Sequence, residues 1–353
     1  MTNLLDWWTI MHRKNNGKNK KIRTSTIIFI ILDLLAISGF IITYGPWDYL
    51  RNLYVNTAMN TMDHKYLARI FYSEEKISEI MNSNYFVSID EDVDLNDIVI
   101  DTSEKNSYKD EYEKELLTRE EGNNLYKLIN LKVGNSNAYL VAIYEPSKVQ
   151  LIAKEKLGTE HGERIITMCE RYGGIVCING GGFVDYGYGS GIPIGYVIED
   201  GVITWSDGDI NTYTSDLIGM TKDGKLKLMS NATGQEALDA GIMDALTFGP
   251  FLIVNGKPLE IHGDPWGRSP RVAIAQRKDG VMMFLVIDGE NYINGASLQD
   301  VVDTLLKYGA YNAANLDGGT SSTLIINNKL INNPPKAKAT NGRYVITGWG
   351  LIP

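Results

Sequence analysis

The longest run of hydrophobic positions lies near the N-terminus, at residues 26–44 (TIIFIILDLLAISGFIITY), and its one charged residue is Asp33. A helix of about 20 apolar residues, rising 1.5 Å per residue, matches the roughly 30 Å hydrocarbon core of a bilayer. The run therefore predicts one transmembrane helix at residues 26–44, although a buried core helix has a similar composition. Asp33 costs about 2.5–3.5 kcal/mol inside a membrane, or indicates a partner helix.

The charge on either side of this run favours the membrane. Residues 1–25 contain six Lys or Arg and one Asp, a net charge of +5, whereas the whole chain carries −9. Positive charge is retained on the cytoplasmic side of a membrane. We therefore expect residues 1–25 to be a cytoplasmic basic tail and the rest of a single-pass plasma-membrane protein to lie outside. Gly45 and Pro46 follow without a small-residue cleavage pattern, which favours an uncleaved signal anchor.

The next segment, residues 45–124, has two patterns. Between Trp47 and Asn84, apolar residues recur at three- and four-residue steps, which predicts helices, and Ser73 has the side chain expected at a helix start. Residues 86–120 are acidic and polar, which is typical of a solvated linker. Their carboxylates lack the rhythm of a calcium loop. We interpret residues 45–124 as a helical spacer and an acidic linker.

From residue 125 the pattern becomes that of strands with glycine-containing turns between them. Alternating or continuous apolar runs predict strands within residues 126–133, 138–146, 149–157, 175–180, 195–203, 216–229, 248–259, 271–280, 282–289 and 322–331. Residues 162–171 and 297–308 predict helices, the second with Ser297 as its N-cap. The pattern indicates an α+β fold, a mixed but largely antiparallel sheet domain with packed helices, over residues 125–353.

Charge and rare residues narrow the classes of function. Once the basic tail is set aside, the remaining chain carries −14, which argues against a nucleic acid partner. Cys169 and Cys177 imply no disulfide framework, and we interpret both as buried apolar residues in neighbouring elements. His161 and His262 are too scattered for a zinc site. We expect no metal and no cofactor, and the oligomeric state stays open.

Three strand ends carry the candidate chemistry: INGGGF (residues 178–183), VIDG (286–289) and NLDGGTSS (315–322). Glycines after a strand expose backbone N–H groups, which can form an anion-binding nest, and Asp288 and Asp317 stand at the rim of the sheet. Asp-Gly is also the commonest hairpin turn, so Asp288-Gly289 alone is weak evidence. Two glycines and three hydroxyl residues after Asp317 exceed what a hairpin requires.

In order, these motifs and the segments between them, including SPRVAIAQRKDG and GRYVITGW, resemble the phosphodiester glycosidase family. The resemblance covers residues 125–353. It implies a mixed α/β fold and a glycosidase, for which we expect a sugar-1-phosphodiester in a surface or secreted glycan as substrate. The family also includes many bacterial exopolysaccharide-associated proteins. Departures occur where the family has Arg-Thr-Ala-Ile-Gly and this chain has Arg271-Val272-Ala273-Ile274-Ala275. They leave the sugar's identity open.

The chemistry assigns provisional roles to these residues. An oxocarbenium-like transition state requires carboxylates, for which Asp317 and Asp288 are the candidates, in either order of roles. Arginine's planar fork suits a phosphate, and Arg271 matches the family's arginine. The candidate substrate-binding residues are Asn179, Gly180, Gly181, Gly318, Gly319, Ser321, Arg343 and the reserve carboxylate Glu290.

Two other functions fit the same residues. One is a non-catalytic phosphoglycan-binding or exopolysaccharide assembly protein, favoured by the altered sequence around Arg271. The other is a metal-dependent phosphodiesterase built on the acidic turns. Under the main hypothesis Arg271, Asp288 and Asp317 meet in one glycine-lined hollow.

Overall fold

The computed structural model describes residues 24–45, 47–59, 65–101, 103–159, 161–185, 191–289, 294–335 and 341–353. The chain divides into two compact units, Met1–Arg51 and Asn52–Pro353. Helix α2 (Thr24–Tyr44) belongs to the first unit, and α3 (Asp48–Met59) crosses the boundary.

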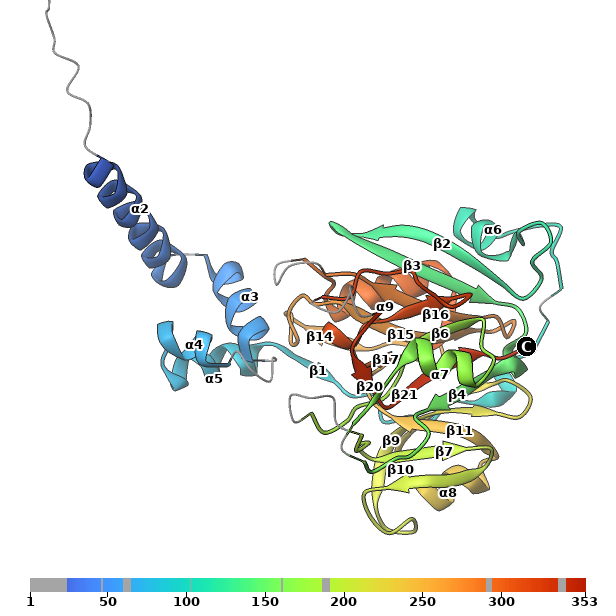
Figure 1. Ribbon diagram of the computed structural model, residues 1–353. Helices are drawn as coiled ribbons and strands as arrows, with labels where there is room; N and C mark the ends of the chain where they lie inside the picture. Colours follow the sequence, from blue (N-terminus) through green and yellow to red (C-terminus); the bar gives the residue numbers. More distant parts are fainter. Residues whose placement is uncertain are drawn as a thin grey trace, which may run out of the picture. The chain divides into compact units, whose positions relative to one another are not determined.

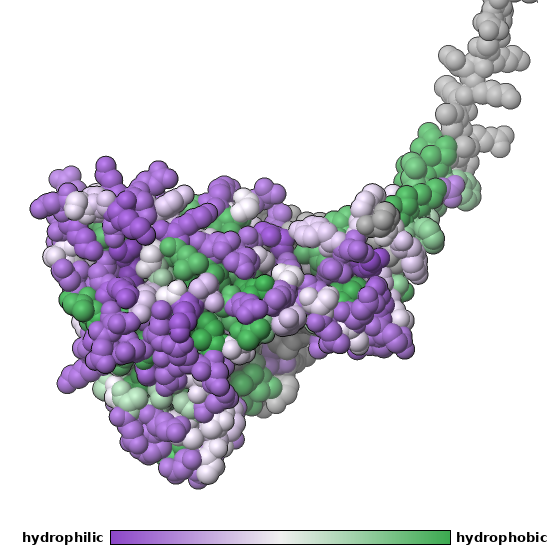
Figure 2. Space-filling model, turned by 180° about the vertical axis from the view of Figure 1, so that it is seen from behind, coloured by the Kyte–Doolittle hydropathy of each residue, from purple (hydrophilic) through white to green (hydrophobic). Residues whose placement is uncertain are grey.

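Helix α2 covers the predicted hydrophobic run. Its described large apolar side chains are exposed, with Phe29 and Leu35 more than half exposed, and Figure 2 shows the surface of this helix as largely hydrophobic. Within the described part of the chain, no helix meets the combined length and hydropathy expected of a membrane span. Membrane anchoring therefore stays a prediction from the sequence.

The predicted helices between Trp47 and Asn84 are α3, α4 (Lys65–Phe71) and α5 (Glu74–Ser83). The Ser73 side chain accepts a hydrogen bond from the Lys76 N–H at the start of α5, as the sequence predicted. The acidic segment is more ordered than the predicted linker. It forms α6 (Glu111–Leu117), and Leu116 and Leu117 are buried because α6 packs on the largest sheet.

Three antiparallel sheets make up most of this unit (Figure 1), which confirms the predicted α+β class. The seven-stranded sheet has the order β13 (Lys257–Pro258), β12 (Phe251–Val254), β17 (Ala310–Leu316), β15 (Arg271–Arg277), β16 (Met282–Ile287), β3 (Ser136–Ile143), β2 (Tyr126–Val133). A five-stranded sheet, called here the second sheet, has the order β19 (Lys329–Leu330), β18 (Leu324–Ile326), β6 (Val176–Asn179), β21 (Thr347–Leu351), β4 (Val149–Ala153).

The third sheet has the order β10 (Leu226–Thr233), β9 (Thr214–Thr221), β11 (Ile242–Thr247), β7 (Tyr196–Glu199), β8 (Val202–Ser206). Two short pairs complete the strands: β1 (Tyr85–Val87) with β14 (Glu260–His262), and β5 (Glu163–Arg164) with β20 (Tyr344–Val345).

The main core lies where the three sheets face one another, and each sheet contributes alternate side chains to it, such as Phe284, Trp349 and Leu246. The outer faces are covered by helices. Helix α9 (Leu298–Lys307) covers the seven-stranded sheet, α7 (Ile165–Arg171) the second sheet and α8 (Gly234–Asp239) the third. Ser297 caps α9 in a reciprocal capping box, as predicted.

One feature of this core differs from expectation. Cys169 of α7 and Cys177 of β6 are buried in neighbouring elements, as predicted, but they form a disulfide. A short turn through Gly173 and Gly174 brings their Cα atoms to 6.0 Å, within the range for a disulfide. The sequence could not show this, because an eight-residue separation does not reveal whether two thiols face each other.

Candidate active site

Two of the three predicted motif loops join at one edge of the sheets. The Asp317 N–H donates to the Gly180 carbonyl at 2.9 Å, so the loop after β17 is bound to the loop after β6. The Asn179 amide nitrogen donates to the Asp317 carbonyl at 2.6 Å, and its oxygen accepts from the Thr323 N–H at 2.9 Å. These bonds fix the loop at Asp317 and at Thr323, so the backbone that carries the Asp317 side chain is held in place.

The same bonds change the role expected of Asn179. Its side chain is fully buried and both of its polar atoms bond to backbone, so it positions the Asp317 loop rather than facing a sugar. The N–H groups of Gly180 and Gly181 donate to the Thr347 carbonyl and hydroxyl. They are therefore not the free donors that the sequence suggested. A Cβ at Gly180 would lie 2.5 Å from Leu246, so close packing explains that glycine.

Asp317 has the electrostatics of a reactive carboxyl. Desolvation by burial raises its pKa to about 6, against the opposing effects of the Ser321 hydroxyl and the Arg343 guanidinium. The carboxylate of Asp185 raises the pKa further, and the Gly318 N–H lowers it. Such a shift, with a named cationic neighbour, is typical of functional sites. A carboxyl with this pKa is mostly ionised at neutral pH and gains a proton in mild acid.

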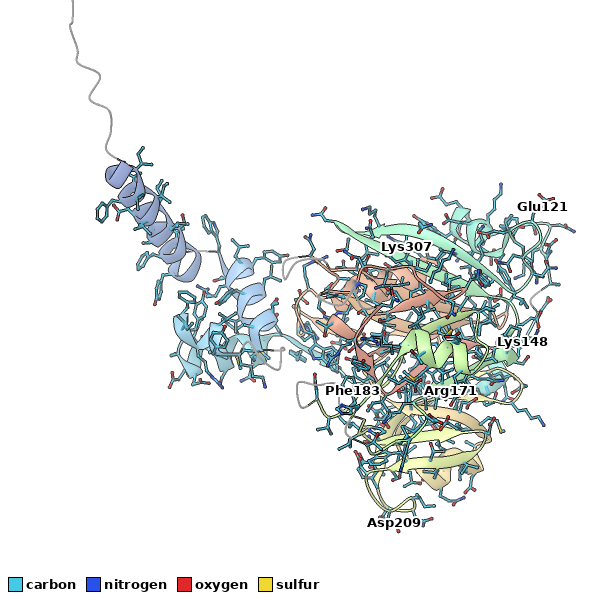
Figure 3. All side chains as sticks on the ribbon, in the orientation of Figure 1. Glu121, Lys148, Arg171, Phe183, Asp209 and Lys307 are labelled. Atoms are coloured by element: carbon cyan, nitrogen blue, oxygen red, sulfur yellow. A yellow bond between two sulfur atoms is a disulfide. The ribbon has the colours of Figure 1, made fainter. Side chains whose placement is uncertain are left out.

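Arg343 is the cation of this site. Its guanidinium forms an ion pair with Asp185 and donates to the Thr320 hydroxyl at 3.0 Å. It also lies over the ring of Phe183, labelled in Figure 3, at 5.1 Å from the ring centre. Arg343 was predicted as a substrate-binding residue, second to Arg271 as a ligand for the phosphate, and the structure gives it the place beside Asp317 that was expected of Arg271.

The hydroxyl and glycines after Asp317 divide into two roles. The Ser321 side chain is 1% exposed, and among the described residues its hydroxyl makes no hydrogen bond of ordinary geometry. A buried hydroxyl in this condition can donate to a bound group. By contrast, the Gly319 N–H donates to the Pro270 carbonyl at 2.9 Å, and a Cβ at Gly318 would lie 2.6 Å from the same oxygen. Gly318 therefore allows tight loop packing, and the Gly319 N–H is already used, so the predicted anion nest is not open here.

Arg271 has a different environment. It is 5% exposed, and its guanidinium donates to the backbone carbonyls of Ala296, Gly267 and Trp266. Burial lowers its pKa to about 10, and its charged neighbours are Asp264, Arg268 and Asp300. The side chain therefore holds loops together on the α9 side of the sheet. The expectation of a phosphate clamp is not supported by these contacts, because the carbonyls already use the guanidinium fork.

Asp288 also differs from the expected partner of Asp317. Strands β16 and β17 both run antiparallel to β15, so Asp288 and Asp317 follow strands that end at the same edge, as predicted. The Asp288 side chain, however, is 2% exposed and accepts from the Asn332 amide at 3.2 Å and the Asn333 N–H at 2.9 Å. The carboxylate whose charge raises the pKa of Asp317 is that of Asp185. Glu290, the reserve carboxylate, lies outside the described residues.

Comparison with known proteins identifies the family. The profile of the phosphodiester glycosidases matches residues 172–352, about half of the chain. The chain belongs to this family. The matched residues include both Asp317 and Arg343, so the site lies within the family's shared domain. Among the described residues, no group of three or more His, Cys, Asp or Glu is arranged to hold a metal.

The relatives are distant and longer. The chain is 30% identical over 184 residues to the SPbeta prophage-derived uncharacterized protein YomE of Bacillus subtilis (strain 168), covering 50% of the chain and 28% of that protein. It is 36% identical over 66 residues to N-acetylglucosamine-1-phosphodiester alpha-N-acetylglucosaminidase of Bos taurus, covering 19% and 12%. The chain thus spans under a third of these relatives.

A solved structure shows the same fold. The catalytic domain of zebrafish N-acetylglucosamine-1-phosphodiester alpha-N-acetylglucosaminidase, auto-inhibited by its pro-peptide, aligns with a TM-score of 0.53 at 20% identity. The alignment covers 65% of this chain and 82% of the zebrafish chain. This likeness supports the fold of the phosphodiester glycosidase domain.

Sequence reasoning missed Asp185. A signal existed, because Asp185 follows the INGGGF motif by two residues, but aspartate after a glycine-rich turn is common. Its importance comes from Arg343, which is 158 residues away in the chain.

Proposed function

We propose that this protein hydrolyses the bond between the anomeric carbon of a sugar and the phosphate of a phosphodiester. The observation that carries the proposal is the partly buried Asp317 carboxyl, whose pKa is raised to about 6 by desolvation, beside Arg343 and within a phosphodiester glycosidase domain. Carboxylate and guanidinium are the two groups that the reaction needs, one for the sugar and one for the phosphate.

The proposed step uses these groups as follows. Arg343 binds the phosphoryl oxygens, exchanging part of its bonding to Asp185 and Thr320 for the substrate. The bond from the anomeric carbon to the phosphate oxygen breaks, and its electron pair leaves with the phosphate monoester. Ionised Asp317 stabilises the positive charge that develops on the sugar ring. A water oxygen then bonds to the anomeric carbon and its proton passes to solvent.

The Ser321 hydroxyl supports the departing group. It is buried beside Asp317, whose pKa it lowers, and in the proposed step it donates to an oxygen of the phosphate. A phosphate monoester is already a good leaving group, so strong acid assistance is less important than positioning. One carboxyl with a raised pKa and one guanidinium are therefore sufficient for the proposed reaction.

Turnover of a synthetic sugar-1-phosphodiester tests this function, with release of free sugar and phosphate monoester followed by mass spectrometry. We expect Asp317→Asn and Arg343→Gln each to lower kcat/KM by about a hundredfold or more. Asp209→Asn, in an exposed loop of the third sheet, and Arg119→Lys, whose guanidinium also lies over an aromatic ring, serve as matched controls. Unchanged turnover in Asp317→Asn would remove the mechanism.

A second candidate is a non-catalytic phosphoglycan-binding or exopolysaccharide assembly protein. It is favoured by the ion pair to Asp185, because a phosphate must compete with that carboxylate for Arg343. Binding of phosphodiester substrates by the wild type, with no product from any of them, would support this candidate over the enzyme.

We also propose that residues 26–44 anchor the protein to the plasma membrane, with residues 1–25 in the cytoplasm. The basic flank supports the orientation, and the Cys169–Cys177 disulfide is typical of proteins outside the cytoplasm. The full chain should fractionate with membranes, and its domain should be accessible to protease added outside intact cells. A chain without residues 1–45 should remain in the soluble fraction. Soluble full-length protein would contradict the anchor.

A further inference from the structure

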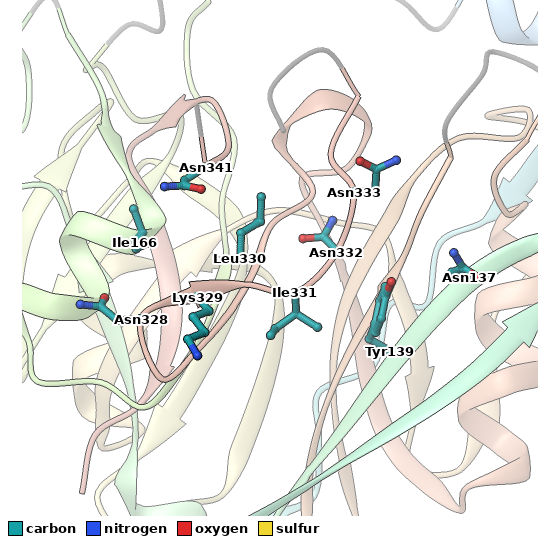
Figure 4. Close-up of a pocket in the computed structure, with 10 residues that line it drawn as sticks. All are labelled: Asn137, Tyr139, Ile166, Asn328, Lys329, Leu330, Ile331, Asn332, Asn333 and Asn341. Atoms are coloured by element: carbon teal, nitrogen blue, oxygen red, sulfur yellow. The ribbon is translucent and has the colours of Figure 1, made fainter. Parts of the chain in front are cut away.

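A hollow of about 490 Å³ lies at the rim between the seven-stranded and second sheets (Figure 4). Asn137 and Tyr139 of β3 form one side, and Ile166 of α7 and Asn341 stand on the other. The segment 328–333, from the β18–β19 turn onward, forms the part between them. The volume is within the range of small-molecule sites, roughly 300–1,000 Å³.

Buried bonds make one part of the hollow rigid. The Asp288 carboxylate accepts from the Asn332 amide and the Asn333 N–H, while the Asp288 N–H donates to the Asn137 carbonyl at 2.8 Å. Asp288 thus ties β3 to the segment opposite it. The Asn332 amide also donates to the Ser322 carbonyl and its oxygen accepts from the Leu324 N–H. The lining is therefore held in shape before any ligand binds.

The lining is rich in amides: Asn137, Asn328, Asn332, Asn333 and Asn341 make up half of its ten residues. The fold accounts for part of this. Asn328 has a φ of 61° in the β18–β19 turn, and the Asn332 amide is engaged in the buried bonds. Neither reason applies to Asn137, which lies exposed within strand β3. Its side-chain oxygen accepts from Lys132 at 2.6 Å, and this bond orients its N–H groups.

The lining chemistry selects the class of ligand. Among the described lining residues there is no carboxylate, and Lys329 is the single charged group. A phosphate would meet that one cation with the buried Asp288 carboxylate close beneath, which disfavours an anion. Amides can donate to and accept from neighbouring hydroxyls, and Tyr139, Ile166 and Ile331 offer apolar surface to the C–H face of a sugar ring.

We propose that this hollow is a binding site for a neutral sugar residue, separate from the Asp317–Arg343 site. Segment 317–333 runs from one site to the other. We therefore expect the ligand of the hollow to be a sugar of the same glycan that is hydrolysed at the Asp317–Arg343 site. In this respect the inference rests on the proposed function. Asp288 then acts as a positioning residue for the hollow, and the aspartate predicted as catalytic shapes a sugar subsite instead.

Direct binding tests the inference without requiring turnover. Trimers of N-acetylglucosamine, α-1,4-linked glucose and β-1,4-linked glucose are titrated into the full chain in detergent, with ligand-observed NMR and calorimetry as readouts. We expect at least one trimer to bind with a Kd on the order of millimolar, and inorganic phosphate at equal concentration not to displace it. Asn137→Ala and Tyr139→Ala should each weaken binding by about tenfold, whereas Tyr139→Phe should keep most of it.

Controls separate the hollow from the rest of the molecule. Asn211→Ala, an exposed asparagine in the third-sheet region, should bind as the wild type does, and thermal unfolding checks that each variant folds. The inference is overturned if none of the trimers binds, if phosphate competes, or if Asn137→Ala and Tyr139→Ala bind normally.

Turnover of the small sugar-1-phosphodiester is measured in parallel. Turnover without trimer binding leaves the proposed function standing and removes the hollow as a sugar site. Trimer binding that depends on Asn137, without turnover, removes the enzyme proposal and keeps the hollow as a glycan-binding site.

Discussion

At the scale of single residues, Asp317 shows how burial can create chemistry at neutral pH. The carboxyl of an aspartate in water has a pKa near 3.8, but burial raises the pKa of Asp317 to about 6, although the positive charge of Arg343 nearby lowers it. Because this carboxyl changes its charge near neutral pH, the rate of the proposed reaction should depend on pH in that range.

The pH profile follows from the role proposed for Asp317. The ionised form is the active one, so kcat/KM should rise as the pH increases through about 6 and then level off. The measurement is kcat/KM between pH 4.5 and 8.5 on a sugar-1-phosphodiester, with Asp317→Asn lacking the rise. A fall in kcat/KM through pH 6 would show that Asp317 acts as an acid instead.

Asp244 is a second buried carboxyl, 7% exposed on β11 and outside the proposed site. Burial raises its pKa to about 7; a hydrogen bond from the Asp200 N–H opposes this shift, and the negative charges of Asp200 and Glu199 add to it. The folded state therefore binds this proton more tightly than the unfolded state. The contribution of Asp244 to stability is complete below the unfolded pKa near 3.8, and it is lost as the pH rises through 7.

Asp244→Asn should remove that loss. At pH 8 we expect the free energy of unfolding of the variant to exceed that of the wild type by a few kcal/mol, since each pKa unit corresponds to about 1.4 kcal/mol. The variant should therefore have the higher Tm at pH 8, and the two proteins should have similar Tm values near pH 4. Thermal unfolding across this range is the measurement, and Asp303→Asn on the exposed face of α9 is the control. A variant less stable than the wild type at pH 8 would contradict the assignment.

At the scale of elements, the disulfide joins α7 to β6 next to the start of the INGGGF loop. Its loop spans a sequence separation of 8, for which chain entropy gives about 2–3 kcal/mol of stabilisation. The double variant Cys169→Ala/Cys177→Ala should lose about this much free energy of unfolding in urea. Reducing agent should lower the wild type to a similar value and leave the variant unchanged. Equal stability of both proteins without reductant would contradict the bond.

Helices and strands themselves follow local rules in this protein. Ser73 and Ser297 cap α5 and α9 as expected, since capping depends on a few adjacent residues. The apolar pattern predicted the bounds of β2, and it predicted β3 with its two ends displaced by two and three residues. The acidic segment was misjudged because Glu113 pairs with Arg277 of β15, and that distant partner turns a polar run into a docked helix.

At the scale of the whole molecule, Asn179 connects the second sheet to the loop after the seven-stranded sheet. Asn179→Ala would leave the Asp317 carbonyl and the Thr323 N–H without their partner in a buried place. We expect a loss of about 2–4 kcal/mol in the free energy of unfolding and a drop in kcat, since Asp317 loses its support. Urea unfolding and turnover measure the two effects. Asn211→Ala is the control, and lost turnover with unchanged stability would assign Asn179 to the substrate instead.

The sequence by itself predicted most of the strands, although not β11 or β21, and the caps of α5 and α9. It also indicated that Asp317 and the glycine-rich loops lie at strand ends. Alternation, capping and turn chemistry involve residues close in the chain, so a sequence shows them directly. The tertiary structure alone decided that Arg343 and Asp185 stand beside Asp317, that carbonyls occupy Arg271, and that Asp288 supports the asparagine-lined hollow. These choices depend on which buried polar groups find partners across distant segments, because each group must be satisfied by whatever packs against it.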